Sequence, residues 1–402
     1  MPAWLSVIGV GADGLDGLGS VAHRLIETAE TVVGGERHLA MLKPTHRAER
    51  LTWTTPLSET VAAIAVRRGR PVAVLATGDP LWFGIGVTLA RAFAPEEMVV
   101  VPHLSAFSLA AARMAWAIDE AETLTLHGRP LDKLALHLAP AARILALSEN
   151  GETPASVARY LSERGWGPSV LTVLENLGGV AERRIAGPAD KWSHPRAADL
   201  NTLAIECRPG PNAVYWPRVP GLPDNAFVHD GQLTKREIRA ATLAVLGPLP
   251  GALLWDVGAG CGSIAIEWMR AAPRARAIAL EREPSRLALI ARNAAALGVP
   301  QLRILEGEAP AAFTGLDHPD AIFIGGGLST PGLIESGWQA LKPGGRMSAN
   351  AVTIEGEARL LSWHNRFGGA LIRIAVSRAE ELGAFQGWRP LMPVTQWNVT
   401  KP

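Results

Sequence analysis

The chain has 402 residues, enough for two or more domains that each bury a hydrophobic core. Its 39 basic and 38 acidic residues nearly cancel, which gives no electrostatic basis for binding nucleic acid or an anionic membrane. The two cysteines, Cys207 and Cys261, lie far apart in sequence, so the sequence predicts neither a disulfide framework nor a metal site.

The N-terminal segment carries no targeting signal. Residues 1–5 lead directly into an apolar strand pattern, without a basic region or a cleavage site. No apolar run approaches the roughly 18 residues that a membrane-spanning helix needs. These features predict a cytoplasmic protein.

The first strand pattern, residues 4–10, leads into Gly9-Val10-Gly11-Ala12-Asp13-Gly14, which matches the dinucleotide fingerprint G-x-G-x-x-G. A nicotinamide site also needs a helix directly after the glycines and an acid at the end of the next strand. Here the helix pattern begins only near Ser20, and the next strand, residues 31–33, ends in Gly34-Gly35. A nicotinamide oxidoreductase is therefore the weaker interpretation of this turn.

Two further strand-to-turn patterns follow in the same half of the chain. Residues 70–76 predict a strand that ends in Thr77-Gly78-Asp79-Pro80-Leu81-Trp82. Residues 99–101 predict a strand that continues into Pro102-His103-Leu104-Ser105-Ala106-Phe107-Ser108 and a helix rich in small residues. Glycine in such a turn frees the backbone to adopt unusual angles and to approach a ligand.

These three turns, together with the segments 147–154, 173–179 and 200–206, resemble the tetrapyrrole methylase family. The resemblance implies a two-lobed α/β fold with S-adenosylmethionine (SAM) in a cleft between the lobes. It also implies donor-binding roles for Gly9, Thr77, Gly78, Asp79, Trp82, Ser105 and Ala106 in the first lobe, and for Leu177, Asn201 and Thr202 in the second. The family commonly has glycine where this chain has His103, which we interpret as a packing residue rather than a base.

Residues 206–226 hold five prolines and two glycines. Proline at this density removes backbone donors and disfavours both helix and sheet, so the stretch is typical of a semi-rigid linker. The sequence therefore predicts a domain at 1–205, a linker at 206–227 and a second domain at 228–402.

The second domain opens with a helix signal and a glycine-rich turn. Thr234 and Glu237 have the spacing of a capping box, which predicts a helix from about Lys235. An apolar run at residues 253–257 then leads to glycines at 258, 260 and 262, followed by a helix pattern. Because position 263 is Ser, this is G-x-G-x-G rather than the dinucleotide form, and it resembles motif I of the Rossmann-like SAM methyltransferases.

Around this turn, the segments 227–239 and 303–310 resemble the decarboxylating precorrin methyltransferases. The resemblance implies a Rossmann-like domain with a mostly parallel sheet, completed by antiparallel strands near 371–376 and 393–399. Donor-binding roles are implied for Thr234, Gly258, Ala259, Gly260, Cys261, Gly262, Glu281 and Ala309. Glu281 closes the second strand, where a carboxylate can accept the ribose hydroxyls; Cys261 we interpret as a small turn residue rather than a nucleophile.

Both modules on one chain, in this order, resemble the fused decarboxylating methyltransferases of cobalamin biosynthesis. The resemblance implies one SAM per module and methylation of a precorrin at C5 and C15, with loss of CO2 from the C12 acetate, giving precorrin-8X. It also implies a homo-oligomer assembled through the C-terminal module, with a tetramer as the candidate assembly.

The residues that act on the substrate are less evident from the sequence. We predict His229 or Glu308 as the acid that assists decarboxylation, and Arg282, Arg286 and Arg389 as partners of the substrate's carboxylates. Another two-module corrinoid methyltransferase and a non-catalytic corrinoid carrier remain as alternatives, and a carrier should bind no SAM.

Overall fold

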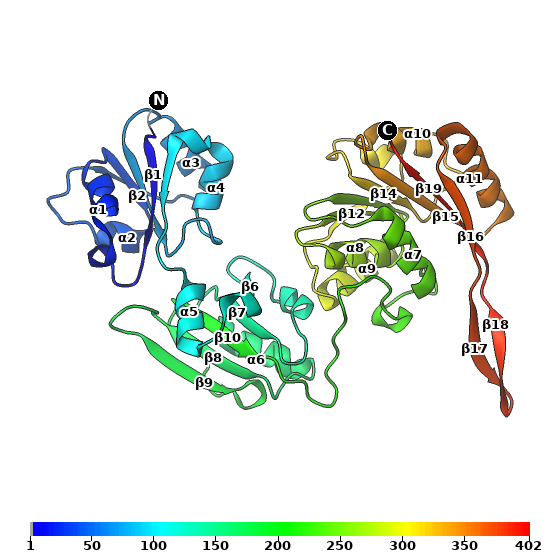
Figure 1. Cartoon of the computed structure of the whole chain (residues 1–402), viewed down its shortest axis with the longest axis horizontal. Coiled ribbons are helices and arrows are strands. Elements are labelled where there is room, and N and C mark those ends of the chain that lie inside the picture. Colours follow the sequence, from blue (N-terminus) through cyan, green and yellow to red (C-terminus); the bar gives the residue numbers. More distant parts are fainter. Residues whose placement is uncertain (1–2) are drawn as a thin grey trace. The chain divides into compact units, whose positions relative to one another are not determined.

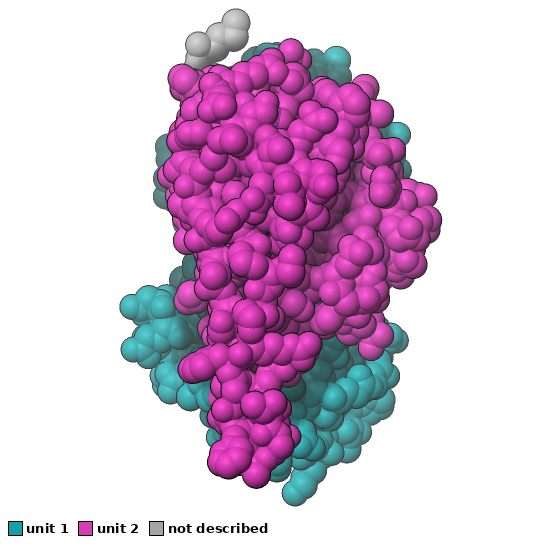
Figure 2. Space-filling view, turned by 90° about the vertical axis from the view of Figure 1, so that its right-hand side faces the viewer, with its two compact units in different colours: residues 1–131, 139–214 teal, residues 132–138, 215–402 magenta. Residues whose placement is uncertain are grey.

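The computed structural model describes residues 3–402, so the first two residues of the expected 1–205 domain lie outside it. The chain forms two compact units (Figure 2). Unit 1 comprises the residues up to Leu131 together with Ala139–Val214, and unit 2 comprises Asp132–Leu138 and Tyr215–Pro402. Among residues 3–402, no helix is both long and apolar enough to cross a bilayer.

The first lobe of unit 1 is a parallel sheet in the order β3-β2-β4-β1-β5 (Figure 1). Its strands are β1 Leu5–Val10, β2 Thr31–Gly34, β3 Glu49–Thr52, β4 Val72–Thr77 and β5 Met98–Val101. Its helices are α1 Ser20–Glu27, α2 Glu36–Ala40, α3 Leu57–Ala65 and α4 Gly86–Ala92. Separate apolar clusters lie on the two sheet faces, one with α1 and α2 and the other with α3 and α4. The helix expected near Ser20 is confirmed.

The second lobe is a mixed sheet in the order β6-β7-β10-β8-β9, in which only β6 and β7 run parallel. Its strands are β6 Glu122–Thr125, β7 Arg143–Leu147, β8 Val170–Glu175, β9 Arg183–Pro188 and β10 Asn201–Glu206. Two helices belong to it, α5 Ala106–Met114 and α6 Thr153–Glu163. Helix α5 packs on β7 and β10 through Phe107, Ala110 and Ala111.

Unit 2 is built on a seven-stranded sheet in the order β13-β12-β11-β14-β15-β19-β16. The first five strands are parallel, and β19 pairs antiparallel with both β15 and β16. The strands are β11 Leu253–Val257, β12 Arg276–Glu281, β13 Arg303–Glu306, β14 Ala321–Ile324, β15 Arg346–Ala351, β16 Ala370–Ile374 and β19 Val394–Thr400. The predicted mostly parallel sheet with antiparallel strands at one edge is therefore confirmed.

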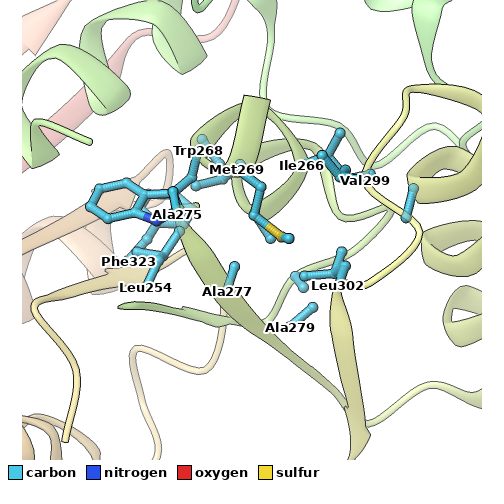
Figure 3. Packing of buried hydrophobic residues seen from close by; sticks show 14 of the residues in the cluster. Leu254, Ile266, Trp268, Met269, Ala275, Ala277, Ala279, Val299, Leu302 and Phe323 are labelled. Atoms are coloured by element: carbon cyan, nitrogen blue, oxygen red, sulfur yellow. The ribbon is translucent and has the colours of Figure 1, made fainter. Parts of the chain in front are cut away.

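Helices cover both faces of this sheet. They are α7 Arg236–Leu246, α8 Ser263–Ala271, α9 Pro284–Ala296, α10 Leu333–Ala340 and α11 Ile354–Phe367. Leu254 belongs to the core under α8 and α9 (Figure 3), whereas its neighbours Leu253 and Trp255 belong to the core under α10 and α11. This two-sided burial explains why β11 is apolar without alternation.

A hairpin of β17 (Ser377–Leu382) and β18 (Phe385–Pro390) extends away from the rest of unit 2 (Figure 1). The sequence analysis did not foresee it. Leu382, Phe385 and Trp388 are 70%, 80% and 77% exposed. An arm with this much exposed apolar surface is unusual for a part of a protein that contacts only water.

The proline-rich stretch expected as a linker is held by both units. In unit 1, the N–H of Cys207 donates to the carbonyl of Ala142 at 2.8 Å. In unit 2, the Arg270 guanidinium donates to the carbonyls of Trp216 and Pro217 at 3.0 and 3.1 Å. Leu222 is also part of the unit 2 core. Proline removes regular backbone pairing here, so backbone groups of the stretch bond to the Ala142 carbonyl in unit 1 and to the Arg270 side chain in unit 2.

Candidate functional site

Unit 2 contains a cavity of about 750 Å³ at the carboxyl edge of its parallel strands. This is the edge at which open α/β sheets bind their ligands. The lining comes from the turns after β11 to β14, from the end of β15 and from the residues that flank the hairpin. It includes Thr234, Gly258, Ala259, Gly260, Cys261, Glu281, Glu308, Ala309, Asn350, Val352, Val376 and Met392.

The glycine turn after β11 requires glycine for two different reasons. Gly258, Gly260 and Gly262 have φ angles of +71°, +59° and +82°, which L side chains rarely adopt. A Cβ on Gly258 would also lie 2.9 Å from the backbone nitrogen of Gly326, whereas one on Gly260 would meet nothing closer than 3.7 Å. Gly260 therefore faces open space in the cavity. Gly258 allows the turn after β11 to contact the turn after β14 at Gly326.

Glu281 is buried and holds this turn in place. Its carboxylate accepts N–H bonds from Gly260 at 2.8 Å, Arg282 at 3.0 Å and Glu283 at 3.1 Å. Three such donors orient both oxygens and leave one of about four lone-pair sites, on Oε2, for a ligand hydroxyl. The predicted ribose role is compatible with this geometry and stays a prediction.

Burial shifts the pKa of two other groups at this turn toward the neutral form. Burial raises the pKa of Asp256 to about 7; one of its oxygens accepts from the Ala265 N–H at 3.0 Å, and the other has no partner. Burial also raises the pKa of Cys261 to about 11. A thiol in this state is a poor nucleophile, which favours the interpretation of Cys261 as a small turn residue.

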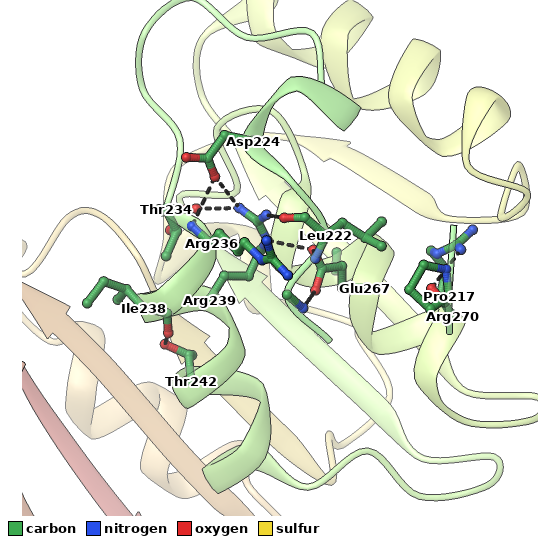
Figure 4. Close-up of polar contacts among 12 residues, drawn as sticks. Pro217, Leu222, Asp224, Thr234, Arg236, Ile238, Arg239, Thr242, Glu267 and Arg270 are labelled. Atoms are coloured by element: carbon green, nitrogen blue, oxygen red, sulfur yellow. Dashed lines mark hydrogen bonds and ion pairs between the residues drawn. The ribbon is translucent and has the colours of Figure 1, made fainter. Parts of the chain in front are cut away.

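The expected capping box at Thr234 is wrong. Helix α7 begins at Arg236, its N-cap is Lys235, and Asp224 accepts the Arg236 N–H at 2.9 Å instead of a side chain within the helix. Thr234 lines the cavity, and its carbonyl accepts from the buried Arg239 (Figure 4). The Thr234 loop is thus fixed through its backbone, which leaves the side chain facing the cavity.

Arg239 and Glu267 form a buried ion pair, 2.6 Å between Nε and Oε1, with side chains 0% and 2% exposed. Arg239 also donates to the carbonyls of Thr234 and Leu222. Glu267 accepts the N–H groups of Gly221 and Leu222 at 2.5 and 3.0 Å. The pair therefore joins the cavity loop, α8 and the proline-rich segment (Figure 4).

The residues predicted to act on the substrate, two acids and three arginines, differ in how they lie relative to the cavity. Glu308 lines the cavity but has a 61% exposed side chain beside Arg282 at 3.3 Å. His229 accepts the Gly231 N–H at 3.0 Å and is absent from the lining that residues 3–402 provide. The other predicted carboxylate partners, Arg286 and Arg389, already pair with Asp230 at 2.8 Å and Glu380 at 3.0 Å.

In unit 1, three predicted turns converge on Gly9. A Cβ at Gly9 would lie 2.0 Å from the carbonyl oxygen of Gly78 and 2.7 Å from the backbone nitrogen of His103. A Cβ at Gly11 would lie 2.7 Å from the His103 ring. His103 thus fills space that the two glycines leave open, as the packing interpretation predicts.

The remaining donor-site candidates of unit 1 have varied surroundings. Asp79 accepts the Leu81 N–H at 2.8 Å, and Trp82 lies against Phe107 with ring centroids 5.4 Å apart. Ser105 is the N-cap of α5 and accepts the Ser108 N–H at 3.0 Å, which leaves Ala106 as the first helical residue.

In the second lobe, Leu177, Asn201 and Thr202 are buried. The Asn201 amide accepts from Ser148 at 2.6 Å and donates to the Ala198 carbonyl at 2.8 Å. Its side chain therefore serves the lobe's own structure, so any donor contact would use its backbone.

A polar group beside Thr77 was missed by the sequence analysis. The Arg37 guanidinium donates to the Thr77 hydroxyl at 3.2 Å and lies 3.4 Å from Nε2 of His38. Burial, together with the Arg37 charge, lowers the pKa of His38 to about 4, so the imidazole is neutral. The available signal was Arg37-His38, one residue after Gly34-Gly35 at the carboxyl end of a parallel strand.

Comparison with known proteins identifies both units. Residues 5–192 match the Tetrapyrrole (Corrin/Porphyrin) Methylases family, and residues 225–401 match the Precorrin methyltransferase domain. A Precorrin-6Y C(5,15)-methyltransferase [decarboxylating] from Sinorhizobium sp. is 51% identical over 398 residues, which cover 99% of this chain and 96% of the relative. The chain belongs to this family. The predicted family, fold class and enzyme class are confirmed, and SAM is the methyl donor that the family implies.

Two shorter relatives each match less than half of the chain. A Cobalt-precorrin-7 C(5)-methyltransferase from Salmonella typhimurium is 32% identical over 181 residues, 44% of this chain and 88% of the relative. A Probable cobalt-precorrin-6B C(15)-methyltransferase (decarboxylating) from Saccharolobus solfataricus is 34% identical over 156 residues, 37% of this chain and 78% of the relative. The two activities named in the longer relative therefore also occur on separate proteins.

Proposed function

We propose that the chain methylates a precorrin at C5 and C15 and releases the C12 acetate carboxyl as CO2, giving precorrin-8X in cobalamin biosynthesis. The observation that carries this proposal is 51% identity along nearly the whole length of a relative with that name. Each unit has glycine turns at the carboxyl edge of its parallel strands, and the turns of the two units are built differently. This supports two donor sites on one chain, one in each unit.

Unit 1 carries out the C5 transfer, and unit 2 carries out the C15 transfer and the decarboxylation. Separate relatives with C5 and C15 names, each matching less than half of the chain, support this division. The Precorrin methyltransferase domain matched at residues 225–401 supports methyl transfer to a precorrin by unit 2.

The protein's contribution is mainly positional. A bound SAM supplies an activated methyl group to a nucleophilic ring carbon, and the conjugated ring can accept the electron pair left by CO2. In unit 2, Glu281 and the backbone of Gly258 and Gly260 would hold the donor, and the cavity around them would exclude water. Holding the reacting atoms in line supplies the effective concentration that the transfer needs.

Arg37 is our candidate for binding a substrate carboxylate in unit 1. Its recorded hydrogen-bond partners, Thr77 and His38, are both neutral, and no carboxylate of residues 3–402 forms an ion pair with it. It stands at the carboxyl edge of a parallel sheet, beside a predicted donor-site residue. Unlike Arg286 and Arg389, its guanidinium has no competing acid.

The β17–β18 hairpin supports a homo-oligomer formed through unit 2, for which a tetramer is our proposal. Leu382, Phe385 and Trp388 expose large apolar side chains that a second copy of the arm could cover. Two exposed hairpins can pair by their edges and bury these side chains between them.

Titration of the intact chain with labelled SAM tests the proposal. Saturation at two equivalents per chain is expected, followed by a product that carries two new methyl groups and one carboxyl fewer by mass spectrometry. Uptake of no donor would favour a carrier. A plateau at one equivalent would refute a donor site in each unit.

A further inference from the structure

The order of the strands divides the unit 2 cavity into two halves. The predicted donor contacts Ala309, Glu281 and Gly258 lie at or just after the ends of β13, β12 and β11, which are neighbours in the sheet. Continuing in the same direction, the next strands are β14 and β15, with Asn350 near the end of β15. Four strand spacings separate β13 from β15, about 19 Å. The β15 side of the cavity therefore lies beyond the donor's reacting end.

The residues that the end of β15, β19 and the flanks of the hairpin contribute to the lining are mostly apolar. Val352, Val376, Leu391, Met392 and Val394 line the cavity from β15, from β19 and from the flanks of the hairpin. Asn350 is the polar side chain that β15 contributes to the lining. Glu308, which follows β13, lies at the donor end of the strand order.

Asn350 belongs to a hydrogen-bond network beneath α7. It lies directly opposite Gln396 on β19, and the Gln396 Nε2 donates to the Asn350 Oδ1 at 2.9 Å. The Asn350 Nδ2 donates to the Thr242 hydroxyl at 3.1 Å, and Gln396 donates to the same hydroxyl at 2.8 Å. Thr242 and Gln396 are 0% exposed.

One bond in this network fixes the orientation of both amides. The Thr242 hydroxyl has a single proton, which it donates to the Ile238 carbonyl at 2.8 Å (Figure 4). Because a carbonyl only accepts, the Thr242 oxygen can only accept from Asn350 and Gln396. Asn350 must therefore direct its NH2 group toward Thr242. One N–H of this group donates to the Thr242 hydroxyl, and the second N–H is available to another acceptor.

A buried polar network stabilises a protein less than well-packed apolar residues unless every member is satisfied. This network is not needed to join β15 and β19, whose backbones pair from Arg346 to Ala351. Its distinctive result is a rigid amide at the wall of the cavity. Such support by buried neighbours is typical of side chains that bind a ligand.

We propose that Asn350 binds the substrate of the C15 reaction by donating its free N–H to a carboxylate of the precorrin. The inference rests on the proposed function, since it takes the precorrin as the occupant of the β15 half. Thr242 and Gln396 are positioning residues that hold the Asn350 amide in the donating orientation.

Three substitutions in the full chain test this role. Asn350→Ala should raise the KM for the precorrin in the C15 reaction about 10- to 100-fold, the loss of one hydrogen bond to a charged group. Asn350→Asp, which has nearly the same shape, should be worse than Asn350→Ala because it sets a carboxylate against a carboxylate. Asn398→Ala removes the far end of the network, 3.2 Å from Gln396, and should change the KM less than two-fold.

The same samples contain the controls. C5 methylation by unit 1 reports that the chain is intact, and SAM affinity reports the donor half of the cavity; both should stay within two-fold of wild type. An Asn350→Asp variant that is more active than Asn350→Ala would overturn the proposal, because a carboxylate at this position should repel the carboxylate of the precorrin. An equal loss of SAM affinity and C15 activity would also overturn it, by assigning Asn350 to the donor.

If Asn350→Ala impairs folding, Thr242→Val replaces it as the test variant. Thr242→Val should raise the KM for the precorrin in the C15 reaction and leave SAM affinity unchanged. An unchanged KM would count against the proposal. Failure of the wild-type chain to methylate C15 would refute the proposed function instead, and so is distinguishable from failure of this inference.

Discussion

Glu267→Gln should destabilise unit 2 by about 3–5 kcal/mol, the usual effect of removing one partner from a fully buried ion pair. The structure supports the upper part of this range. Arg239 would keep its charge while 0% exposed, with only Asp224 at 3.5 Å as a remaining acid. The substituted amide could still accept one backbone N–H, but Gly221 and Leu222 need two acceptors.

Urea unfolding followed by hydrogen exchange of peptides from β11 and α8 measures this loss without interference from unit 1. Arg239→Met should have a similar effect, and the double substitution should be far less destabilising than the sum of the two, because the residues act as one unit. SAM affinity of unit 2 should fall in parallel, since Arg239 also holds the Thr234 loop at the cavity. A loss below about 1 kcal/mol, typical of exposed pairs, would refute the claim that this pair is desolvated.

The pH dependence of unit 2 should reflect Asp256, whose pKa burial raises from 3.8 to about 7. The folded state holds this proton more tightly than the unfolded chain, so stability should fall as the pH rises from about 4 to 7, and Asp256→Asn should flatten that slope in denaturation curves measured across this range. Gly258→Ala should abolish SAM binding to unit 2 in a calorimetric titration, because it adds a backbone collision to positive φ. Gly260→Ala adds φ strain and a methyl group that faces the cavity but meets no protein atom closer than 3.7 Å, so it should weaken SAM binding less than Gly258→Ala does. Trp388→Ser should shift the oligomer toward smaller species in sedimentation velocity, with SAM binding to unit 1 unchanged; an unaltered distribution would remove the arm from the assembly.

The glycine turns were the most predictable part of the molecule. Gly9, Gly78, Gly258 and Gly262 lie where only glycine avoids collision or strain, so local sequence carries the signal directly. The two-unit architecture followed from these turns and from the proline-rich stretch between them.

What the sequence could not provide was long-range pairing. Thr234 and Glu237 have capping-box spacing, yet Asp224 caps the helix from twelve residues upstream. Arg286 was a reasonable carboxylate ligand until Asp230, 56 residues away, was found beside it. Asn350 was overlooked because its importance depends on Thr242 and Gln396, more than 40 residues from it in either direction.

The attachment of residues 215–227 to unit 2 decides where the two halves can be separated. A polypeptide that started at residue 228 would lack the groups that satisfy Glu267 and Arg270, and Leu222 and Phe227 would be missing from its interior. Truncation there is expected to give an insoluble or molten product, even though composition alone makes it the natural place to cut. Recombinant pieces meant to report on each activity should therefore divide between Val214 and Tyr215, a cut that leaves Asp132–Leu138 of unit 2 on the first piece.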